Sequence, residues 1–223
     1  MLFLDRSFAG QLLAKDLAAY ANRTEVIVLA LPRGGVPVAF EIAEVLNVVL
    51  DVLMVRKLGV PNQEELAMGA IASGNVQILN EDIVRDLNIS ERIIAKVAAK
   101  EHQELERREQ LYRGNRPFPE LQGKAVILVD DGLATGATMW AAIVAVRQQQ
   151  PARIVVAVPV AASPSYQELA TKVDEVVCIA TPSPFYSVGQ WYEKFPQTTD
   201  DEVHDLLRKA ATRQKHLSLG TPS

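Results

Sequence analysis

Two adjacent carboxylates stand between an apolar run and a loop of small residues. Asp130 and Asp131 follow residues 126–129, and the loop continues as Ala134, Thr135, Gly136, Ala137 and Thr138. Backbone N–H groups and threonine hydroxyls at the start of a helix can enclose a phosphate. Carboxylates beside such an anion would accept hydrogen bonds from vicinal hydroxyls or act through Mg²⁺. The combination predicts a ribose phosphate site; the alternative is that Asp131 caps the helix and Asp130 faces solvent.

This loop differs from two common nucleotide-binding motifs. No Gly-Lys-Ser/Thr follows Gly136, so the segment is not a Walker A loop, and the main support for nucleoside triphosphate hydrolysis is missing. The Gly-x-Gly-x-x-Gly spacing of dinucleotide-binding proteins is also absent.

Two further segments place cations at predicted strand ends. The first holds Arg33, Gly34 and Gly35, and the second holds Arg56 and Lys57. Exposed backbone N–H groups and cations at the carboxyl edge of a sheet can bind a diphosphate. The alternatives are an ordinary strand-to-helix turn for the first segment and a solvent-directed basic pair for the second.

The segment 126–138 resembles the thirteen-residue signature of type I phosphoribosyltransferases, with four apolar residues, two acids and a Thr-Gly-x-Thr close. The resemblance covers about residues 25–179 and is nearest to the small phosphoribosyltransferases of unassigned base. It implies that Asp130 and Asp131 bind the 2′ and 3′ hydroxyls of 5-phosphoribosyl 1-diphosphate (PRPP). It also implies that residues 134–138 hold the 5-phosphate.

The resemblance assigns the cationic segments as well. It implies a diphosphate loop at Arg33, Gly34 and Gly35, with a strained or cis peptide between Pro32 and Gly34. An Arg-Lys pair in related enzymes precedes a flexible catalytic loop, which here corresponds to residues 58–66 and contains Glu64 and Glu65. Whether these two glutamates help to close the site or only aid solubility stays open.

Aromatic residues gather near the C-terminal part of the chain. Five of the 13 aromatic side chains lie between residues 185 and 195. A stacking platform for a planar base is one interpretation, with Phe185, Tyr186 and Trp191 as base-binding candidates. The equally weighted alternative is a cluster that packs an irregular loop onto the core. In the family that the signature resembles, a variable hood from the C-terminal part often reads the base.

Alternating helical patterns and short β-branched runs predict an α/β fold with a mainly parallel central sheet flanked by helices. We expect strands at 25–31, 49–55, 124–130, 153–160 and 173–179, and a hairpin formed by 67–72 and 76–79. Helices are expected at 7–20, 36–46, 136–149, 163–172 and 200–213. Residues 80–113 should form an inserted helical segment split near Asn88, with Ser90 as N-cap. One domain then spans 1–223, with a hood at 180–200 and a flexible tail at 214–223.

Composition narrows the class of protein. The 223 residues are 48% hydrophobic with a net charge of -4, which argues against a nucleic-acid binder. No secretory or membrane-spanning segment is expected, so the predicted location is the cytoplasm.

The single cysteine, Cys178, is interpreted as a packed strand residue rather than a nucleophile. His102, His204 and His216 lack the spacing of metal ligands. The charged stretch 100–109 is a solvated helix face or a surface for a partner subunit.

The resulting functional hypothesis is a Mg²⁺-dependent transfer of the phosphoribosyl group from PRPP to a nitrogen nucleophile, such as a nucleobase, with release of diphosphate. Asp130, Asp131 and Lys57 are the expected catalytic residues. PRPP itself is expected to hold most of the Mg²⁺ ligands, with a water-mediated contact to Asp130 or Asp131. A homodimer or larger assembly is expected from the family. The alternative is a regulator that binds PRPP without turnover, and a weaker one is a phosphorolytic or hydrolytic enzyme.

Overall fold

Five parallel strands form the central sheet of the computed structural model, which describes residues 2–219 and their side chains except at positions 64, 65 and 215–219. The strand order is β2-β1-β6-β7-β8. Every residue of β1 and β6 is buried, as expected of strands covered on both faces. The strands are β1 (Val26–Ala30), β2 (Val49–Val52), β6 (Ala125–Val129), β7 (Arg153–Val160) and β8 (Glu175–Ala180).

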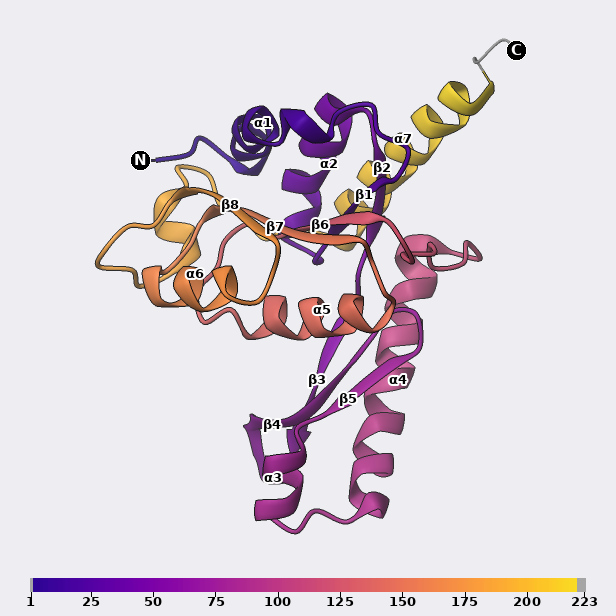
Figure 1. The fold of residues 1–223 in the computed structure, drawn as a ribbon, viewed down its shortest axis with the longest axis vertical. Coiled ribbons are helices and arrows are strands. Elements are labelled where there is room, and N and C mark those ends of the chain that lie inside the picture. Colours follow the sequence, from indigo (N-terminus) through magenta and orange to yellow (C-terminus); the bar gives the residue numbers. More distant parts are fainter. Residues whose placement is uncertain (1, 220–223) are drawn as a thin grey trace.

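Helices cover both faces of this sheet (Figure 1). One face packs on α1 (Arg6–Asp16), α2 (Gly35–Leu46) and α7 (Asp200–Leu219), and the other on α5 (Ala137–Gln148) and α6 (Ser163–Ala170). Successive side chains of β1 point to opposite faces, so Val28 enters the first core and Leu29 the second. The carboxyl ends of β1 and β6 therefore lie side by side between two filled layers.

An arm projects from the sheet and carries a second, antiparallel sheet (Figure 1). Its elements are β3 (Val55–Val60), β4 (Gln63–Ala72), β5 (Val76–Leu79), α3 (Glu81–Asp86) and α4 (Glu91–Arg113). Arg113, at the end of α4, pairs with Asp51 of β2 over 3.1 Å and donates to the Val52 carbonyl over 2.7 Å. Both charged side chains are less than a tenth exposed, so this buried pair fixes the arm to the central sheet.

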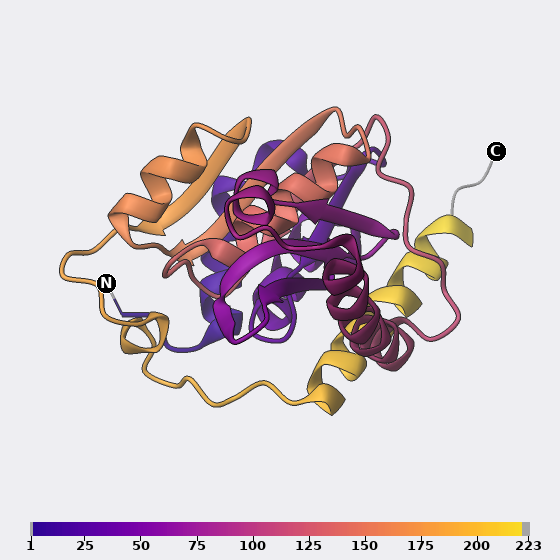
Figure 2. The ribbon, with the colours of Figure 1, turned by 90° about the horizontal axis from the view of Figure 1, so that it is seen from below.

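The segment between β8 and α7 wraps around one side of the molecule and passes the N-terminal residues (Figure 2). It contains a 3-10 turn, η2 (Val188–Trp191), and a similar turn, η1 (Ala18–Tyr20), follows α1. The Phe3 amide donates to the Trp191 carbonyl over 2.8 Å, and the Glu193 amide donates to the Phe3 carbonyl over 2.7 Å. We call residues 181–199 the hood.

The predicted fold class is confirmed: an α/β architecture with a parallel central sheet flanked by helices. The hairpin formed by β4 and β5, and the split of the inserted helices with α4 beginning directly after Ser90, are also as predicted. The final helix extends to Leu219, beyond its predicted end at residue 213, and residues 220–223 of the expected tail lie outside the described residues.

Two predictions for residues 49–66 are wrong. The apolar run 49–55 is not one strand, because β2 ends at Val52 and β3 of the second sheet begins at Val55. Most of the expected loop 58–66 is strand, and the turn between β3 and β4 is confined to Pro61 and Asn62. Asn62 supplies a left-handed residue with φ of 67° to this tight turn.

None of the helices described within residues 2–219 is long and apolar enough to cross a membrane.

Candidate functional site

The two acids lie where β6 ends, at the carboxyl edge of the central sheet. Asp130 and Asp131 are both partly buried, and the Asp131 amide donates to Oδ1 of Asp130 over 2.8 Å. Because ligands of open α/β sheets bind at this edge, the position suits the predicted role of the pair.

The loop after the acids leads directly into α5. Gly136 adopts φ of 76°, a left-handed conformation that favours glycine, and α5 begins at Ala137. The Leu133 amide donates to the Val160 carbonyl over 2.9 Å, and Ser165 Oγ donates to the Ala134 carbonyl over 2.6 Å. The predicted phosphate loop is thus fixed to β7 and α6 near its start and leads at its end into a helix N-terminus, where backbone amides can bind an anion.

The loop after β1 packs directly against the acid pair. A Cβ atom built on Gly34 would lie 2.1 Å from Oδ2 of Asp131, and one on Gly35 would lie 2.6 Å from the Val129 carbonyl oxygen. Only glycine fits at both positions, because any side chain would collide with Asp131 or with the Val129 backbone. The peptide bond between Pro32 and Arg33 is cis, as the family resemblance implies. Two segments that are a hundred residues apart in the sequence thus form one surface.

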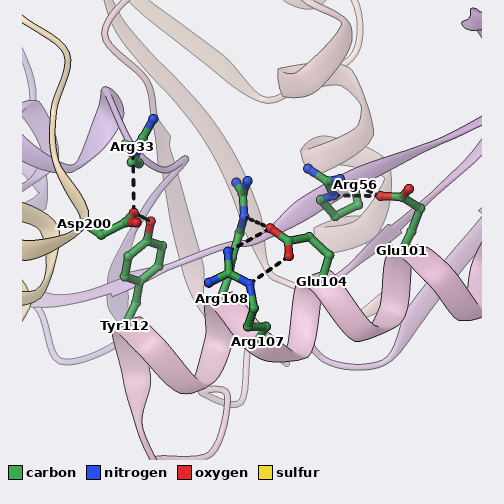
Figure 3. Close-up of polar contacts among 8 residues, drawn as sticks. All are labelled: Arg33, Arg56, Glu101, Glu104, Arg107, Arg108, Tyr112 and Asp200. Carbon is green, nitrogen blue, oxygen red and sulfur yellow. Dashed lines mark hydrogen bonds and ion pairs between the residues drawn. The ribbon is translucent and has the colours of Figure 1, made fainter.

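Arg33 is held at this surface by a helix that the sequence did not connect with it. Its Nη1 lies 3.7 Å from Oδ1 of Asp200, the first residue of α7, and the Tyr112 hydroxyl of α4 donates to the same carboxylate (Figure 3). Burial, followed by the hydrogen bond and charge of Asp200, raises the pKa of Tyr112 to about 12. The hydroxyl therefore stays a donor at neutral pH.

Arg56 and Lys57 are not at the edge of the central sheet, contrary to the prediction. Both lie on β3, in the second sheet, because the chain leaves β2 at Val52 and enters the arm. Arg56 Nη2 pairs with Glu101 of α4 over 2.7 Å, and Lys57 is exposed along a groove of about 660 Å³ between β3 and α4. Their assignment to the diphosphate and to catalysis stays a prediction, and the side chains of Glu64 and Glu65 lie outside the described residues.

A third arginine, Arg6, reaches the acid pair and was not predicted. Its Nε donates to Oδ2 of Asp131 over 2.8 Å, and its Nη1 donates to the Pro196 carbonyl over 2.7 Å. The guanidinium also lies 3.8 Å from the centre of the Phe195 ring. The Tyr192 hydroxyl donates to the Asp131 carbonyl over 2.6 Å. Nothing in the sequence near Arg6 distinguishes it, because its partners lie more than a hundred residues away.

The electrostatics of the two acids differ. Burial raises the pKa of Asp130 well above its ordinary value of 3.8, and the neighbouring charge of Asp131 raises it further. Burial also raises the pKa of Asp131, although the charge and hydrogen bond of Arg6 oppose this rise. Asp130 is therefore the carboxyl that gains most from donors such as sugar hydroxyls, whereas Asp131 already has a cationic partner.

The aromatic cluster divides into two ring pairs and one exposed side chain. Tyr192 and Phe195, with ring centroids 4.9 Å apart, pack the hood onto Phe3 and Arg6. Phe185 and Trp191 stack at 6.3 Å, and Nε1 of Trp191 is buried without a hydrogen-bond partner among the described residues. Tyr186 lies apart from these rings and is 82% exposed.

The hood packs against the loop that follows Asp131. A Cβ built on Gly132 would lie 2.4 Å from Cγ1 of Val188.

Cys178, on β8, donates its thiol hydrogen to the Ala180 carbonyl over 3.2 Å, and burial raises its pKa to about 11. A thiol with so high a pKa is a poor nucleophile, which supports the structural interpretation.

Known proteins resemble this chain over most of its length. A family model described as a phosphoribosyl transferase domain matches residues 6–190. Two curated proteins, from two strains of Mycobacterium tuberculosis and each named "putative phosphoribosyl transferase", are 47% identical over 209 residues, covering 94% of this chain and 47% of theirs. The chain thus spans about half the length of these relatives.

Solved structures give the same result. The crystal structure of TT1426 from Thermus thermophilus matches with a TM-score of 0.83 and 41% identity, covering 94% of this chain and 99% of that one. The AQ2163 protein of Aquifex aeolicus matches with a TM-score of 0.51 and 16% identity, covering 91% and 84% of the two chains, and so shares the fold.

Proposed function

Because the chain belongs to the phosphoribosyltransferase family, we propose that it transfers the 5-phosphoribosyl group of PRPP to a nitrogen nucleophile, such as a nucleobase, and releases diphosphate. One observation carries this proposal. Three segments meet at one sheet edge: the acid pair, the helix N-terminus that follows it, and the glycine loop after β1. Gly34 of that loop packs directly against Asp131. Each segment suits a different part of PRPP: diol, 5-phosphate and diphosphate.

The ribose end would be bound by Asp130 and Asp131. A desolvated carboxylate with a raised pKa is stabilised by hydroxyl donors, so the 2′ and 3′ hydroxyls would offset the burial of Asp130. Arg6 would keep Asp131 charged and oriented through its 2.8 Å contact. The 5-phosphate would accept hydrogen bonds from the amides between Ala134 and Thr138 at the start of α5.

The reaction breaks the bond between C1 of the ribose and the diphosphate oxygen and forms a bond from C1 to the nitrogen nucleophile. Negative charge grows on the departing diphosphate, where Arg33 and the amides of Gly34 and Gly35 would stabilise it. The hood would exclude water, the competing nucleophile, and the stacked Phe185 and Trp191 would receive a planar base.

The donor set fits Mg²⁺ that arrives on its substrate. Among the described residues, no group of three or more histidine, cysteine or acidic side chains is arranged to hold a metal ion. Asp130 is the acidic side chain that could contact such an ion through water, because Asp131 is paired with Arg6. When bound, Mg²⁺ would neutralise charge on the diphosphate.

The test is a turnover assay with PRPP, Mg²⁺ and a panel of nucleobases, in which diphosphate release is recorded. We expect base-dependent release by the unaltered chain, loss of release in Asp130→Asn, and no change in Asp205→Asn, a surface substitution on α7. Tight PRPP binding without turnover on any base would overturn the transferase proposal in favour of a regulator. Failure to bind PRPP would remove the site assignment as well.

A further inference from the structure

The inserted helix α4 runs past the diphosphate loop and turns one face towards it. Glu104, Arg108 and Tyr112 follow one another at intervals of four residues and so share a face of the helix. Tyr112, at the end of this row, reaches Asp200, which in turn contacts Arg33 of the diphosphate loop (Figure 3). The row therefore ends beside the segment proposed to bind the leaving group.

Arg107 and Arg108 share a partner but lie differently. Glu104 accepts from Nε and Nη2 of Arg107 over 2.8 and 3.0 Å and from Nε of Arg108 over 2.7 Å. The Arg107 side chain is 60% exposed and that of Arg108 34%. In Figure 3 the Arg108 guanidinium extends from α4 to the side on which Arg33 and Arg56 lie.

Arg33 and Arg108 approach the contact between Tyr112 and Asp200 from two elements. Arg108 precedes Tyr112 by one turn on the same face of α4, and Arg33 reaches Asp200 from the loop after β1 (Figure 3). The ion pair between Arg33 and Asp200 is long, since its 3.7 Å separation exceeds the 2.7–2.9 Å typical of a charge-assisted hydrogen bond. Two cations near one point, with partly exposed acidic partners, favour a multiply charged anion between them.

We propose that Arg108 binds the diphosphate of PRPP together with Arg33, so that the inserted helix α4 forms part of the leaving-group site. Glu104 holds Nε of Arg108, and the two Nη groups carry further donors suited to phosphate oxygens. Hydrogen bonds from Arg107 and Arg108 lower the pKa of Glu104 to about 2, so this anchor stays charged at neutral pH. The inference rests on the proposed function, because it names a further contact to the same substrate.

The test is calorimetric titration of the whole chain with two ligands, PRPP and ribose 5-phosphate, in the presence of Mg²⁺. Arg108→Gln should weaken PRPP binding by about 10- to 100-fold, the cost of a hydrogen bond to a charged group, and leave ribose 5-phosphate binding unchanged. Arg85→Gln breaks an exposed ion pair with Asp82 on α3 and is the control, with no change expected for either ligand. Arg108→Lys should recover part of the loss because it restores the charge.

The outcomes separate the two proposals. If the unaltered chain binds neither ligand, the proposed function fails. If it binds PRPP and Arg108→Gln binds PRPP as tightly as Arg85→Gln does, the role of Arg108 is wrong while the proposed function stands. Equal weakening of PRPP and ribose 5-phosphate by Arg108→Gln would also overturn the assignment to the diphosphate. Thermal melting of both variants checks that they are folded.

Discussion

The Arg6 guanidinium lies 2.8 Å from Oδ2 of Asp131, and the two side chains are only 10% and 15% exposed. The same guanidinium reaches the Pro196 carbonyl and the Phe195 ring. One buried cation thus joins the first helix, the acid pair and the hood. Without Arg6, the charge of the Asp131 carboxylate would be buried without a partner, which would greatly reduce the free energy of unfolding.

Arg6→Met should lower the free energy of unfolding by about 3 kcal/mol, because it leaves Asp131 without its buried partner. Arg23→Met removes an arginine from an exposed pair with Glu25 and should cost less than about 1 kcal/mol. Urea denaturation of both variants measures the difference. Because Arg6 lowers the pKa of Asp131, the deficit should shrink as the pH falls and Asp131 becomes neutral. Equal losses in the two variants would contradict the buried pair.

Asp130→Asn should stabilise the fold at neutral pH while removing PRPP binding. Burial raises the folded-state pKa of Asp130 above 3.8. The stability that the neutral carboxyl provides is therefore fully present below about pH 3.8, and it is lost as the pH rises through the folded-state pKa and the carboxyl becomes charged. The amide is neutral throughout and keeps the acceptor for the Asp131 amide. The gain should be about 1 kcal/mol near pH 7 and should vanish towards pH 4 in urea denaturation. A loss of stability near pH 7 would show that burial of this carboxyl is not costly.

Tyr112→Phe should weaken PRPP binding about fivefold, the equivalent of one hydrogen bond, because Asp200 would hold Arg33 less firmly. Tyr20→Phe is the matched control: it removes a tyrosine hydroxyl that donates to Glu175 over 2.5 Å, and both residues lie outside the proposed site. Calorimetric titration should separate the two, while thermal melting should shift similarly. If both variants bind PRPP alike, the chain from α4 to Arg33 does not position the loop.

Ser165→Ala should weaken ribose 5-phosphate binding about fivefold, since it frees the Ala134 carbonyl that the hydroxyl fixes over 2.6 Å. Ser163→Ala, on the same helix, removes a longer bond of 3.3 Å to the Thr181 carbonyl and should leave the affinity unchanged. Titration with ribose 5-phosphate measures both. Unchanged binding in Ser165→Ala would mean that α6 does not support the phosphate loop.

Local patterns in the sequence were enough to predict the parts of the site that depend on neighbouring residues. The apolar run before Asp130 and the small residues after it specify a strand, a turn and a helix in direct succession, and the structure has all three. The position of Arg33 after β1 followed in the same way. These predictions succeed because the end of a buried strand in a parallel sheet fixes the edge on which its following loop lies.

Apart from the expected loop 58–66, where a local hairpin was missed, the errors and omissions at the site involve contacts between distant segments. Leu53 and Met54 continue the apolar run of β2, so nothing marked the point where the chain leaves the central sheet and carries Arg56 and Lys57 into the arm. Arg6 and Asp200 resemble ordinary charged residues at helix starts. Their roles depend on Asp131 and Arg33, which lie more than a hundred positions away, and no periodicity reports such pairings.

The pairing of the N-terminal residues with the hood has a consequence for ligand entry. The Phe3, Glu193 and Lys194 amides are all held in this pairing, and the Tyr192 hydroxyl fastens it to Asp131. Swinging the hood outward would break these bonds together, so the hood should act as a fixed wall and ligands should enter from the side of the arm. Hydrogen–deuterium exchange should then show these three amides exchanging slowly and as one unit, while the β3–β4 turn exchanges fast.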